Sequence, residues 1–465
     1  MRNNRFDQYK RMLRIISVAL IVAVETLIFY ITWRGWYSDD IYLYKFAVKG
    51  HWFMIGMYIL FSMLFLYIYG GLKLGYFKQA NMIYSQSLSV VCVNVITYLE
   101  IVLLYREVAP PIPILIMTGV DVAVIAVLSF GFDKIYAKLF PPRRTLIIYG
   151  EDHEEILFPK IIKRRDKYII EQTVSDEIGF EALSEMILKY EAVILSDVHA
   201  PLRNTILKFC YGHSIRVYMT PKISDIIIRS SEMLHLFDTP LLLARNNGLT
   251  FEQKFLKRFM DIVCSLLLII VSSPLMAVAA AAIRLYDHGP VLFKQKRLTI
   301  DRKEFYVYKF RSMVVDAEKD GVARLATKND SRITPVGKVI RKLRIDELPQ
   351  LFNVLSGAMS LVGPRPERPE IAEEYEQDTP EFAYRLKVKA GLTGYAQVYG
   401  KYNTTAYDKL KLDLMYIESY SILVDIKILI MTFKILFMEE STEGLDENQT
   451  TASTAKKKKK DEQHP

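Results

Sequence analysis

Cysteine and histidine are scarce in this sequence, and their scarcity excludes several kinds of site. The three cysteines, Cys92, Cys210 and Cys264, lie far apart and form no C-x-x-C pair, so they can build neither a disulfide framework nor a zinc cluster. The seven histidines are equally dispersed, which argues against a histidine-ligated metal. The net charge of +9 suits anionic partners. Because no recognised nucleic-acid readout motif accompanies that charge, we expect no nucleic-acid partner.

Apolar residues are abundant by contrast, at 51% of a chain of 465 residues. Together with 12% aromatic residues, this content indicates membrane segments rather than a purely soluble protein. An apolar run of about 19 residues after Arg14 is long enough to cross a bilayer and lacks a signal-peptide cleavage site. Three further candidate spans follow it, at 52–71, 82–104 and 113–132.

The basic residues that flank these runs predict how the helices are oriented. They gather before the first run, after the second and after the fourth: Arg2, Arg5, Lys10, Arg11, Arg14, Lys73, Lys78, Lys134, Lys138, Arg143 and Arg144. Positively charged loops stay on the cytoplasmic side, and four crossings return the chain to that side. We therefore predict a four-helix transmembrane bundle over residues 1–140. The sequence leaves open whether the bundle does more than anchor the chain.

Residues 141–245 have the pattern of a soluble α/β domain. The apolar runs typical of buried strands are 145–150, 168–174, 192–196 and 215–220. Helical patterns separate these runs, and this alternation predicts a parallel sheet of Rossmann type. A nucleotide-binding fingerprint of three glycines should follow the first strand, but Gly150 stands alone there and acidic residues come soon after it. We therefore expect a structural or regulatory domain that does not bind a nucleotide.

A further apolar run of about 22 residues, near 262–283, is also long enough to span a membrane. Ser272, Ser273 and Pro274 lie at its centre, and proline interrupts the hydrogen bonds of a helix. Basic residues flank both ends, whereas a crossing helix should show asymmetry. We predict a helix–break–helix over 255–284 that enters and leaves the same face of the membrane. A kinked spanning helix is the alternative, since membrane helices tolerate proline.

Two adjacent carboxylates, Asp346 and Glu347, stand among cations in the C-terminal half of the chain. Pro349 suits the first turn of a helix, which would place Asp346 near the N-cap and Glu347 just inside that helix. A bare pair in this position needs no function, because acidic residues are favoured at helix N-termini. The surroundings do suggest a function, because basic residues lie on both sides of the pair: Arg341, Lys342, Arg344, Arg365 and Arg368.

Acids and cations brought together in this way are typical of phosphoryl transfer. Arginine forks and helix N-termini bind phosphate. Carboxylates would repel phosphate unless a divalent ion screens them, and Mg²⁺ is commonly held by carboxylates together with substrate phosphates. Asp346 and Glu347 are therefore the candidate magnesium ligands. Because a carboxylate can also attack phosphorus directly, we predict a membrane-surface phosphotransferase.

Three motifs resemble those of a known family and follow one another in this order: "KFRSM", "DELPQLFNVLSGAMSLVGPRPERPE" and "KAGLTGYAQVYGK". The family is the bacterial sugar transferases, the monotopic polyprenyl-phosphate phosphoglycosyl transferases. The resemblance extends from Phe251 to about Phe437. The upstream bundle and Rossmann-like domain are similar to those of long members that initiate exopolysaccharide, capsule or O-antigen assembly. The resemblance implies a monotopic α/β catalytic domain over 251–437 with a re-entrant membrane helix.

The implied reaction transfers a sugar 1-phosphate from a UDP-sugar, of glucose or galactose type, to undecaprenyl phosphate and releases UMP. Asp346 matches the family's nucleophile, which forms a covalent phosphosugar-enzyme, and Glu347 matches its partner, with a metal-linked or proton-transfer role. The residues that the resemblance implies for substrate binding are Arg341, Pro364, Arg365, Lys309 and Arg311. Ser273 and Pro274 match the kink of the re-entrant helix. The segment 391–394 either shapes the substrate cleft or is a structural turn.

The resemblance also implies a multi-pass protein of the bacterial inner membrane, with the Rossmann-like and catalytic domains in the cytoplasm beside the lipid bilayer. The tail at 438–465 is polar, contains a lysine run and is predicted to be disordered. One alternative is direct transfer in a ternary complex, with Asp346 serving only as a magnesium ligand. An alternative of another class is a membrane sensor or scaffold. The sequence does not identify the sugar, and it leaves open a homo-oligomer.

Overall fold

The described part of the computed structural model comprises residues 7–38, 48–150, 161–162, 164–244, 248–315, 332–400 and 404–436. The chain divides into two compact units, Met1–Thr220 and Pro221–Pro465, and each is described by itself. The lysine-rich tail, for which we predict disorder, lies outside the described residues.

The boundary between the units falls inside the region predicted as one Rossmann-like domain. Helix α8 (Ile223–Arg229) packs against α14 (Ala406–Glu418), and the side chain of Ile226 is buried in the core of the C-terminal unit. The segment from 221 to 244 therefore groups with the C-terminal unit, and its buried apolar contact is made by Ile226 of α8.

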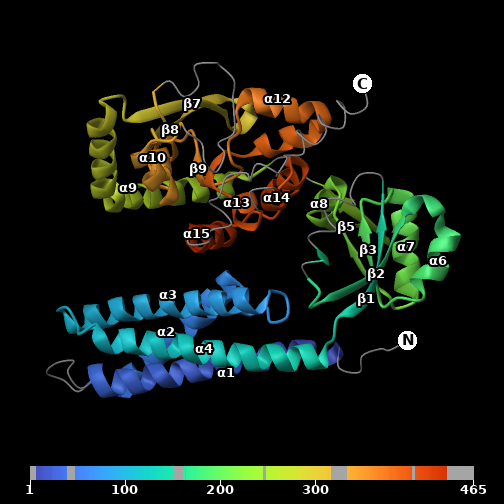
Figure 1. The fold of residues 1–465 in the computed structure, drawn as a ribbon, viewed down its shortest axis with the longest axis horizontal. Coiled ribbons are helices and arrows are strands. Elements are labelled where there is room, and N and C mark those ends of the chain that lie inside the picture. The colour runs from blue at the N-terminus through green and yellow to red at the C-terminus, as the bar shows by residue number, and fades with distance from the viewer. Residues whose placement is uncertain are drawn as a thin grey trace. The chain divides into compact units, whose positions relative to one another are not determined.

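Each of the four apolar runs near the N-terminus forms one long helix. The helices are α1 (Lys10–Thr32), α2 (Val48–Tyr69), α3 (Gln79–Tyr105) and α4 (Ile112–Leu139). Each helix packs against its neighbours in the chain and α1 also packs against α4, so the helices close into a bundle (Figure 1). All four are long and apolar enough to cross a membrane, as judged by length and composition.

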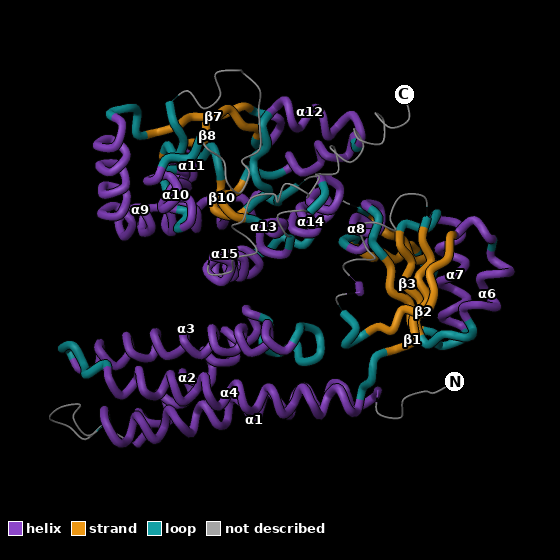
Figure 2. Tube along the Cα trace, viewed as in Figure 1, coloured by secondary structure: helices purple, strands orange, loops and turns teal. Residues whose placement is uncertain are grey.

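The parallel sheet predicted after the bundle is confirmed. Its strands are β1 (Arg143–Tyr149), β2 (Tyr168–Ser175), β3 (Ala192–Ser196) and β4 (Arg216–Met219). They are all parallel and lie in the order β2-β1-β3-β4. Figure 2 shows α6 (Phe180–Ile187) and α7 (Ala200–Gly212) on one side of this sheet, where their buried side chains pack against those of β1 and β3.

Gly150, the lone glycine after β1, has a structural role at this edge of the sheet. Its N–H donates to the Ser196 carbonyl at 3.0 Å. A Cβ at this position would lie 2.6 Å from the Asp197 carbonyl oxygen, too close for any side chain. The backbones after β1 and β3 therefore approach each other closely. This approach requires glycine at position 150, so the presence of Gly150 does not indicate nucleotide binding.

The C-terminal unit consists mainly of helices around short two-stranded sheets. Besides α8 and α14, its elements are β5 (Glu232–Leu236), β6 (Thr239–Leu243), α9 (Phe251–Asp287), β7 (Leu292–Leu298), β8 (Glu304–Phe310), α10 (Pro335–Lys342), α11 (Gln350–Ser356), β9 (Ser360–Val362), α12 (Pro369–Asp378), β10 (Gly391–Thr393), α13 (Tyr395–Tyr399) and α15 (Ile422–Leu436). β7 pairs with β8, and β9 pairs with β10. The core is formed largely by α11, β9, α14 and α15, with side chains that include Leu351, Val354, Leu361, Leu414 and Ile428.

Helix α9 is continuous through Ser272, Ser273 and Pro274, so the predicted break is a bend and not an interruption. Figure 1 shows that α9 changes direction along its length. Pro274 lies inside the helix and cannot donate to the carbonyl of Ile270. The Ser273 hydroxyl donates to that carbonyl instead, at 2.9 Å. The serine thus supplies the hydrogen bond that proline removes, which lets the helix bend without leaving this carbonyl unpaired.

The first half of α9 is fixed to the core by buried polar contacts. Lys257 Nζ donates to Asp425 Oδ2 on α15 at 2.6 Å and to the Tyr416 hydroxyl on α14 at 3.0 Å. Asp261 Oδ1 accepts from the Ser360 hydroxyl at 3.0 Å and from the Leu361 N–H on β9 at 2.9 Å. The same helix therefore positions β9, which leads into the loop that contains Arg365.

Candidate active site

The acid pair lies in a 3-10 turn, η5 (Ile345–Glu347), between α10 and α11. The predicted position in the first turn of a helix is wrong by one turn, because α11 begins at Gln350 with Pro349 as its N-cap. No side chain caps α11, so Asp346 does not act as its N-cap. The reason is local: Arg344 adopts a left-handed conformation (φ 53°), which separates α10 from η5 and starts a new turn at the acids.

Two buried side chains hold this turn in place. Ile345 packs in a small core with residues of α9, β8 and α10. Asn353 on α11 accepts from the Tyr308 N–H at 3.0 Å and donates to the Tyr306 carbonyl at 2.8 Å. These bonds fasten α11 to β8, and Lys309 lies at the end of that strand. The acids and Lys309 are therefore held close together by the hydrogen bonds of Asn353 to the β8 backbone, and not only by the attraction of their charges.

Of the two carboxylates, Glu347 is the one that contacts cationic side chains. Its Oε1 lies 3.0 Å from an Arg365 guanidinium nitrogen and 3.3 Å from Lys309 Nζ, and its Oε2 lies 3.8 Å from Arg344. Burial raises the pKa of Glu347, but the charges of these three cations outweigh burial and hold that pKa well below its usual range. Glu347 is therefore ionised at neutral pH and orders the cations around it.

Asp346, by contrast, lacks such contacts with the described residues. Its side chain makes no hydrogen bond or ion pair with the described residues. Burial, together with the neighbouring charge of Glu347, raises the pKa of Asp346 to about 6. The charges of Lys309, Arg341 and Arg344 oppose this rise. Adjacent carboxylates thus differ in role: one is held by cations, and the other is an available oxygen nucleophile or metal ligand.

The loop that carries Arg365 is fixed by its backbone. β9 pairs with β10, and a Cβ on Gly391 would lie 2.1 Å from the Gly363 nitrogen. This close approach supports the structural interpretation of the segment 391–394, because only glycine permits it. After Gly363 the Pro364 carbonyl accepts from the Gly391 N–H at 2.9 Å.

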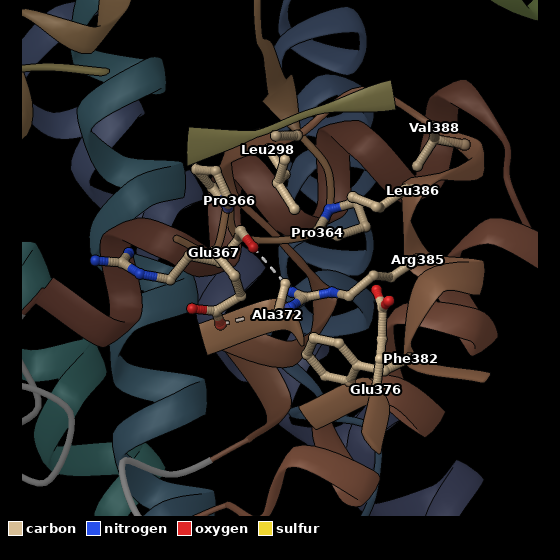
Figure 3. A pocket seen from close by; sticks show the side chains of 12 residues that line it. Leu298, Pro364, Pro366, Glu367, Ala372, Glu376, Phe382, Arg385, Leu386 and Val388 are labelled. Atoms are coloured by element: carbon tan, nitrogen blue, oxygen red, sulfur yellow. Dashed lines mark hydrogen bonds and ion pairs between the residues drawn. The ribbon is translucent and has the colours of Figure 1, made fainter. Parts of the chain in front are cut away.

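A small pocket lies behind this loop (Figure 3). Pro364 lines it together with apolar residues such as Leu298 and Phe382. The buried Arg385 donates from its guanidinium to the Arg365 carbonyl at 2.9 Å and to Glu367 at 3.4 Å, as the dashed lines in the figure indicate. Arg385 therefore fixes the backbone of the loop, and the Arg365 side chain contacts Glu347 from this fixed position.

The other predicted site residues lie in different surroundings. Arg341 is in the last turn of α10, close enough for its charge to act on Asp346. Arg311 does not join the acid pair: its guanidinium binds both carboxylate oxygens of Asp287 and donates to the Pro290 carbonyl at 2.7 Å. Arg311 thereby ties the end of α9 to the end of β8. The predicted kink residues Ser273 and Pro274 lie within α9 itself.

We expect Arg311→Lys to lower stability more than it changes chemistry, because lysine cannot fork onto both oxygens of Asp287. The expected loss is about 1–3 kcal/mol in unfolding free energy, the usual scale for hydrogen bonds to charged groups. Thermal unfolding of the purified variant would be compared with that of the unchanged protein. Unchanged stability of the variant would contradict the structural role of Arg311 at the end of α9.

Three residues of this site are absent from the set predicted to bind substrate. The sequence shows Arg344 as part of the basic run before the acids, but it does not indicate the left-handed backbone of this residue. Asn353 carried no signal, because a single asparagine in an apolar helix is common. Arg385 lies distant in sequence from the loop it supports, so only the structure could reveal the contact.

The residues present fit a magnesium ion in part. The described residues contain no group of three acidic, histidine or cysteine side chains that could enclose a metal. Magnesium, however, is often held by one or two carboxylates and by substrate phosphates, with several waters. The side chain of Asp346, which has no ion-pair partner among the described residues, is suited to that arrangement. Glu347 is already neutralised by cations and is the weaker candidate.

Fold and site together define a membrane-associated protein whose C-terminal unit holds an acid pair among cations, beside a long apolar helix. The family model described as bacterial sugar transferase matches residues 252–439. A Bacillus subtilis (strain 168) protein, provisionally named an undecaprenyl-phosphate N-acetylgalactosaminyl 1-phosphate transferase, is 48% identical over 131 residues, which are 28% of this chain and 73% of that protein. The chain belongs to the bacterial sugar transferase family, as the three motifs predict.

Two longer relatives are also similar to this chain. The UDP-glucose:undecaprenyl-phosphate glucose-1-phosphate transferase of Escherichia coli (strain K12) is 39% identical over 221 residues, which are 46% of this chain and 47% of that protein. The undecaprenyl-phosphate galactose phosphotransferase of Salmonella typhimurium (strain LT2) is 36% identical over 271 residues, which are 55% of each chain. The chain thus spans about half the length of these relatives. The names of the relatives differ in the sugar.

Proposed function

We propose that this chain transfers a sugar 1-phosphate from a UDP-linked hexose to undecaprenyl phosphate. The products are undecaprenyl diphospho-sugar and UMP, and the reaction is the first membrane step of exopolysaccharide, capsule or O-antigen synthesis. The observation that carries the proposal is the pair of adjacent carboxylates, in which Glu347 is ion-paired to Lys309 and Arg365 while Asp346 has no ion pair with the described residues. The names of the relatives support both substrates. They name different sugars, so the proposal extends only to the class of hexose.

The chemistry takes place in two displacements at one phosphorus. First, a carboxylate oxygen of Asp346 attacks the sugar-proximal phosphorus of the UDP-sugar. The bond from that phosphorus to the bridging oxygen breaks, and UMP leaves with the bonding electrons. A phosphate oxygen of undecaprenyl phosphate then attacks the same phosphorus, which releases the Asp346 carboxylate. Neither step consumes water or any further reactant.

The cations make these displacements possible by neutralising charge. An anionic nucleophile approaching a diphosphate meets strong repulsion unless fixed positive groups lie nearby. Lys309 and Arg365 are held in place by Glu347, and Arg341 lies close to Asp346. A magnesium ion held by Asp346 and Glu347 together with the substrate phosphates would supply further positive charge to the leaving group.

A panel of UDP-sugars with undecaprenyl phosphate, scored for UMP release by the purified full chain, tests the activity. Release with at least one UDP-hexose is expected, and release that requires no divalent ion would remove magnesium from the proposal. The absence of UMP with every sugar, from folded protein, would contradict the function.

Omission of the lipid acceptor separates the covalent route from direct transfer. The covalent route predicts one UMP per enzyme and an intact mass increased by one phosphosugar. Direct transfer in a ternary complex predicts neither. A membrane sensor or scaffold would release no UMP under any of these conditions.

Arg341→Ala should lower the turnover rate at least about tenfold, about 1.4 kcal/mol in barrier, while the fold stays intact. Arg341→Lys should restore only part of that rate, because an ammonium group cannot fork onto two phosphate oxygens. Steady-state UMP release by both variants would be compared with that of the unchanged protein. Full activity of the lysine variant would show that the residue acts only as a point charge.

The topology of α9 is part of the same proposal. We infer that α9 enters and leaves one face of the membrane, because it bends, contains Pro274 and has basic residues before and after it. The four preceding helices then cross the membrane and leave both soluble regions in the cytoplasm, where nucleotide sugars are available.

The accessibility of Asp301, an exposed residue after α9, tests this topology. In a background without the three native cysteines, Asp301→Cys should react with an impermeant thiol reagent only after the cells are opened. Adding Pro274→Leu should straighten the helix and let part of the population cross, so that some labelling occurs in intact cells. Labelling from outside in the protein that retains Pro274 would refute the re-entrant arrangement.

A further inference from the structure

The interior of the N-terminal bundle contains two buried carboxyl groups that the proposed reaction does not use. The side chain of Glu25 on α1 is 1% exposed, and that of Asp121 on α4 is 0% exposed. Neither forms an ion pair with any described residue. Ionised carboxylates in such a place are costly, and buried acids within apolar bundles are a reason to look for a site.

A chain of hydrogen bonds connects one of these acids across three helices. The Tyr58 hydroxyl on α2 donates to Asn94 Oδ1 on α3 at 3.1 Å. The Asn94 amide donates in turn to Asp121 Oδ2 at 3.0 Å and to the Thr118 hydroxyl at 2.9 Å on α4. This chain fixes one oxygen of Asp121 and uses every polar atom of the asparagine side chain.

Other oxygens of the same interior have no hydrogen-bond partner among the described residues. They include one buried atom from each helix: Glu25 Oε1, Ser62 Oγ, Thr97 Oγ1 and Asp121 Oδ1. Unpaired buried oxygens are rare in folded proteins, and each one costs free energy unless something binds it.

Glu25, Ser62 and Asp121 lie near one level of the bundle, while Thr97 lies on the other side of the Tyr58–Asn94 contact. The rings of Phe29 and Tyr58 stack at 4.4 Å, which sets α1 and α2 side by side at that height. Glu25 lies one turn before Phe29 and Ser62 one turn after Tyr58, so on antiparallel neighbours they come to the same height. Glu25 and Asp121 are also close enough to interact electrostatically.

Oxygen donors with excess negative charge and no cation among the described residues call for a positively charged ligand. We propose that Glu25, Asp121 and the unpaired hydroxyl groups around them form a buried binding site for a monovalent cation, either a proton shared by the two carboxyl groups or a sodium ion. A single positive charge would relieve the repulsion between the acids and satisfy their free oxygens. Among the described residues, the titratable groups at the site are Glu25, Tyr58 and Asp121, while Asn94, which α3 contributes, is neutral.

The test uses the purified full chain in detergent and does not depend on transferase activity. Thermal unfolding is measured over a range of pH and over a sodium series, with choline chloride replacing sodium at constant ionic strength. The variant Glu25→Gln/Asp121→Asn keeps the side-chain shapes and removes both charges. Glu100→Gln on α3 is the matched control, because Glu100 is a partly exposed carboxyl group of the same bundle outside the proposed site.

For a sodium site, we expect the unfolding midpoint to rise with sodium in the unchanged protein and in the control, and to stay constant in the double variant. For a shared proton, sodium has no effect, and the midpoint of the unchanged protein falls relative to the double variant as pH rises. In that case the infrared C=O stretch of a protonated carboxyl group disappears in the double variant. Identical sodium and pH responses of the two proteins, with the infrared band unchanged, would overturn the proposal.

Discussion

Asp346→Asn should lower UMP release by about a thousandfold or more, which is about 4 kcal/mol in barrier. The amide is neither a nucleophile nor a good magnesium ligand, and Asp346 has no hydrogen bond to a described residue whose loss could explain the effect. Steady-state UMP release and the intact mass of the enzyme after incubation with UDP-sugar alone would be measured. Neither turnover nor a phosphosugar-enzyme is expected.

The same substitution should leave the protein folded and should stabilise it at neutral pH. Burial raises the pKa of Asp346 to about 6, above its value in the unfolded chain, so the native state loses stability as pH rises through that range. The amide of the variant cannot ionise and therefore avoids this loss. The variant should gain on the order of 3 kcal/mol at pH 7, and almost nothing below about pH 3. A variant that is inactive because it is unfolded would instead be less stable than the unchanged protein at neutral pH.

Glu347→Gln is the matched comparison. Here the neighbouring cations hold the pKa of Glu347 low, so removal of the charge should disorder Lys309 and Arg365 and cost stability at neutral pH. Near-normal turnover by folded Asp346→Asn protein, beside an inactive Glu347→Gln variant, would reverse the roles of the two acids.

Lys257→Met should have the largest effect on stability, a loss of about 3–5 kcal/mol. Lys257 and Asp425 form an ion pair at 2.6 Å, with side chains 6% and 0% exposed. Removal of the cation leaves the Asp425 charge buried, with the Tyr416 hydroxyl still donating to it at 2.7 Å. The midpoint of thermal unfolding in detergent, followed by circular dichroism, would report the loss.

The double variant Lys257→Met/Asp425→Leu is the control for this pair. Because it removes both charges of this pair, it should recover most of the lost stability, while Tyr416 can still donate to the Val362 carbonyl at 3.2 Å. A double variant as unstable as the single one would show that the lysine contributes through packing of its stem and not through its charge.

Features that depend only on residues adjacent in the chain follow from the sequence alone. Long apolar runs specify helices α1 to α4, because a helix satisfies the backbone of so many apolar residues within its own segment. Short apolar runs at regular spacing specify the parallel sheet, and its strand positions agree within a few residues. The three ordered motifs, one of which contains Asp346 and Glu347, indicate the family, because such motifs rarely arise together by chance.

Which cations contact the acid pair depends on the folded chain. Arg365 and Lys309 reach Glu347 from 18 and 38 residues away, and no local pattern encodes such contacts. Arg311 belongs to the same motif as Lys309 but turns instead to Asp287. The reason is that β8 ends at Phe310 and the Arg311 N–H donates to the Val291 carbonyl, which places this residue beside the end of α9.

The tertiary structure also decided which acids are left uncompensated. Asp346 has no ion pair with the described residues although cations surround it in the sequence. Glu25 and Asp121 lie almost 100 residues apart in the chain and are enclosed in one bundle. Both outcomes have the same physical reason: burial and charge compensation depend on neighbours that are distant in sequence and near in space.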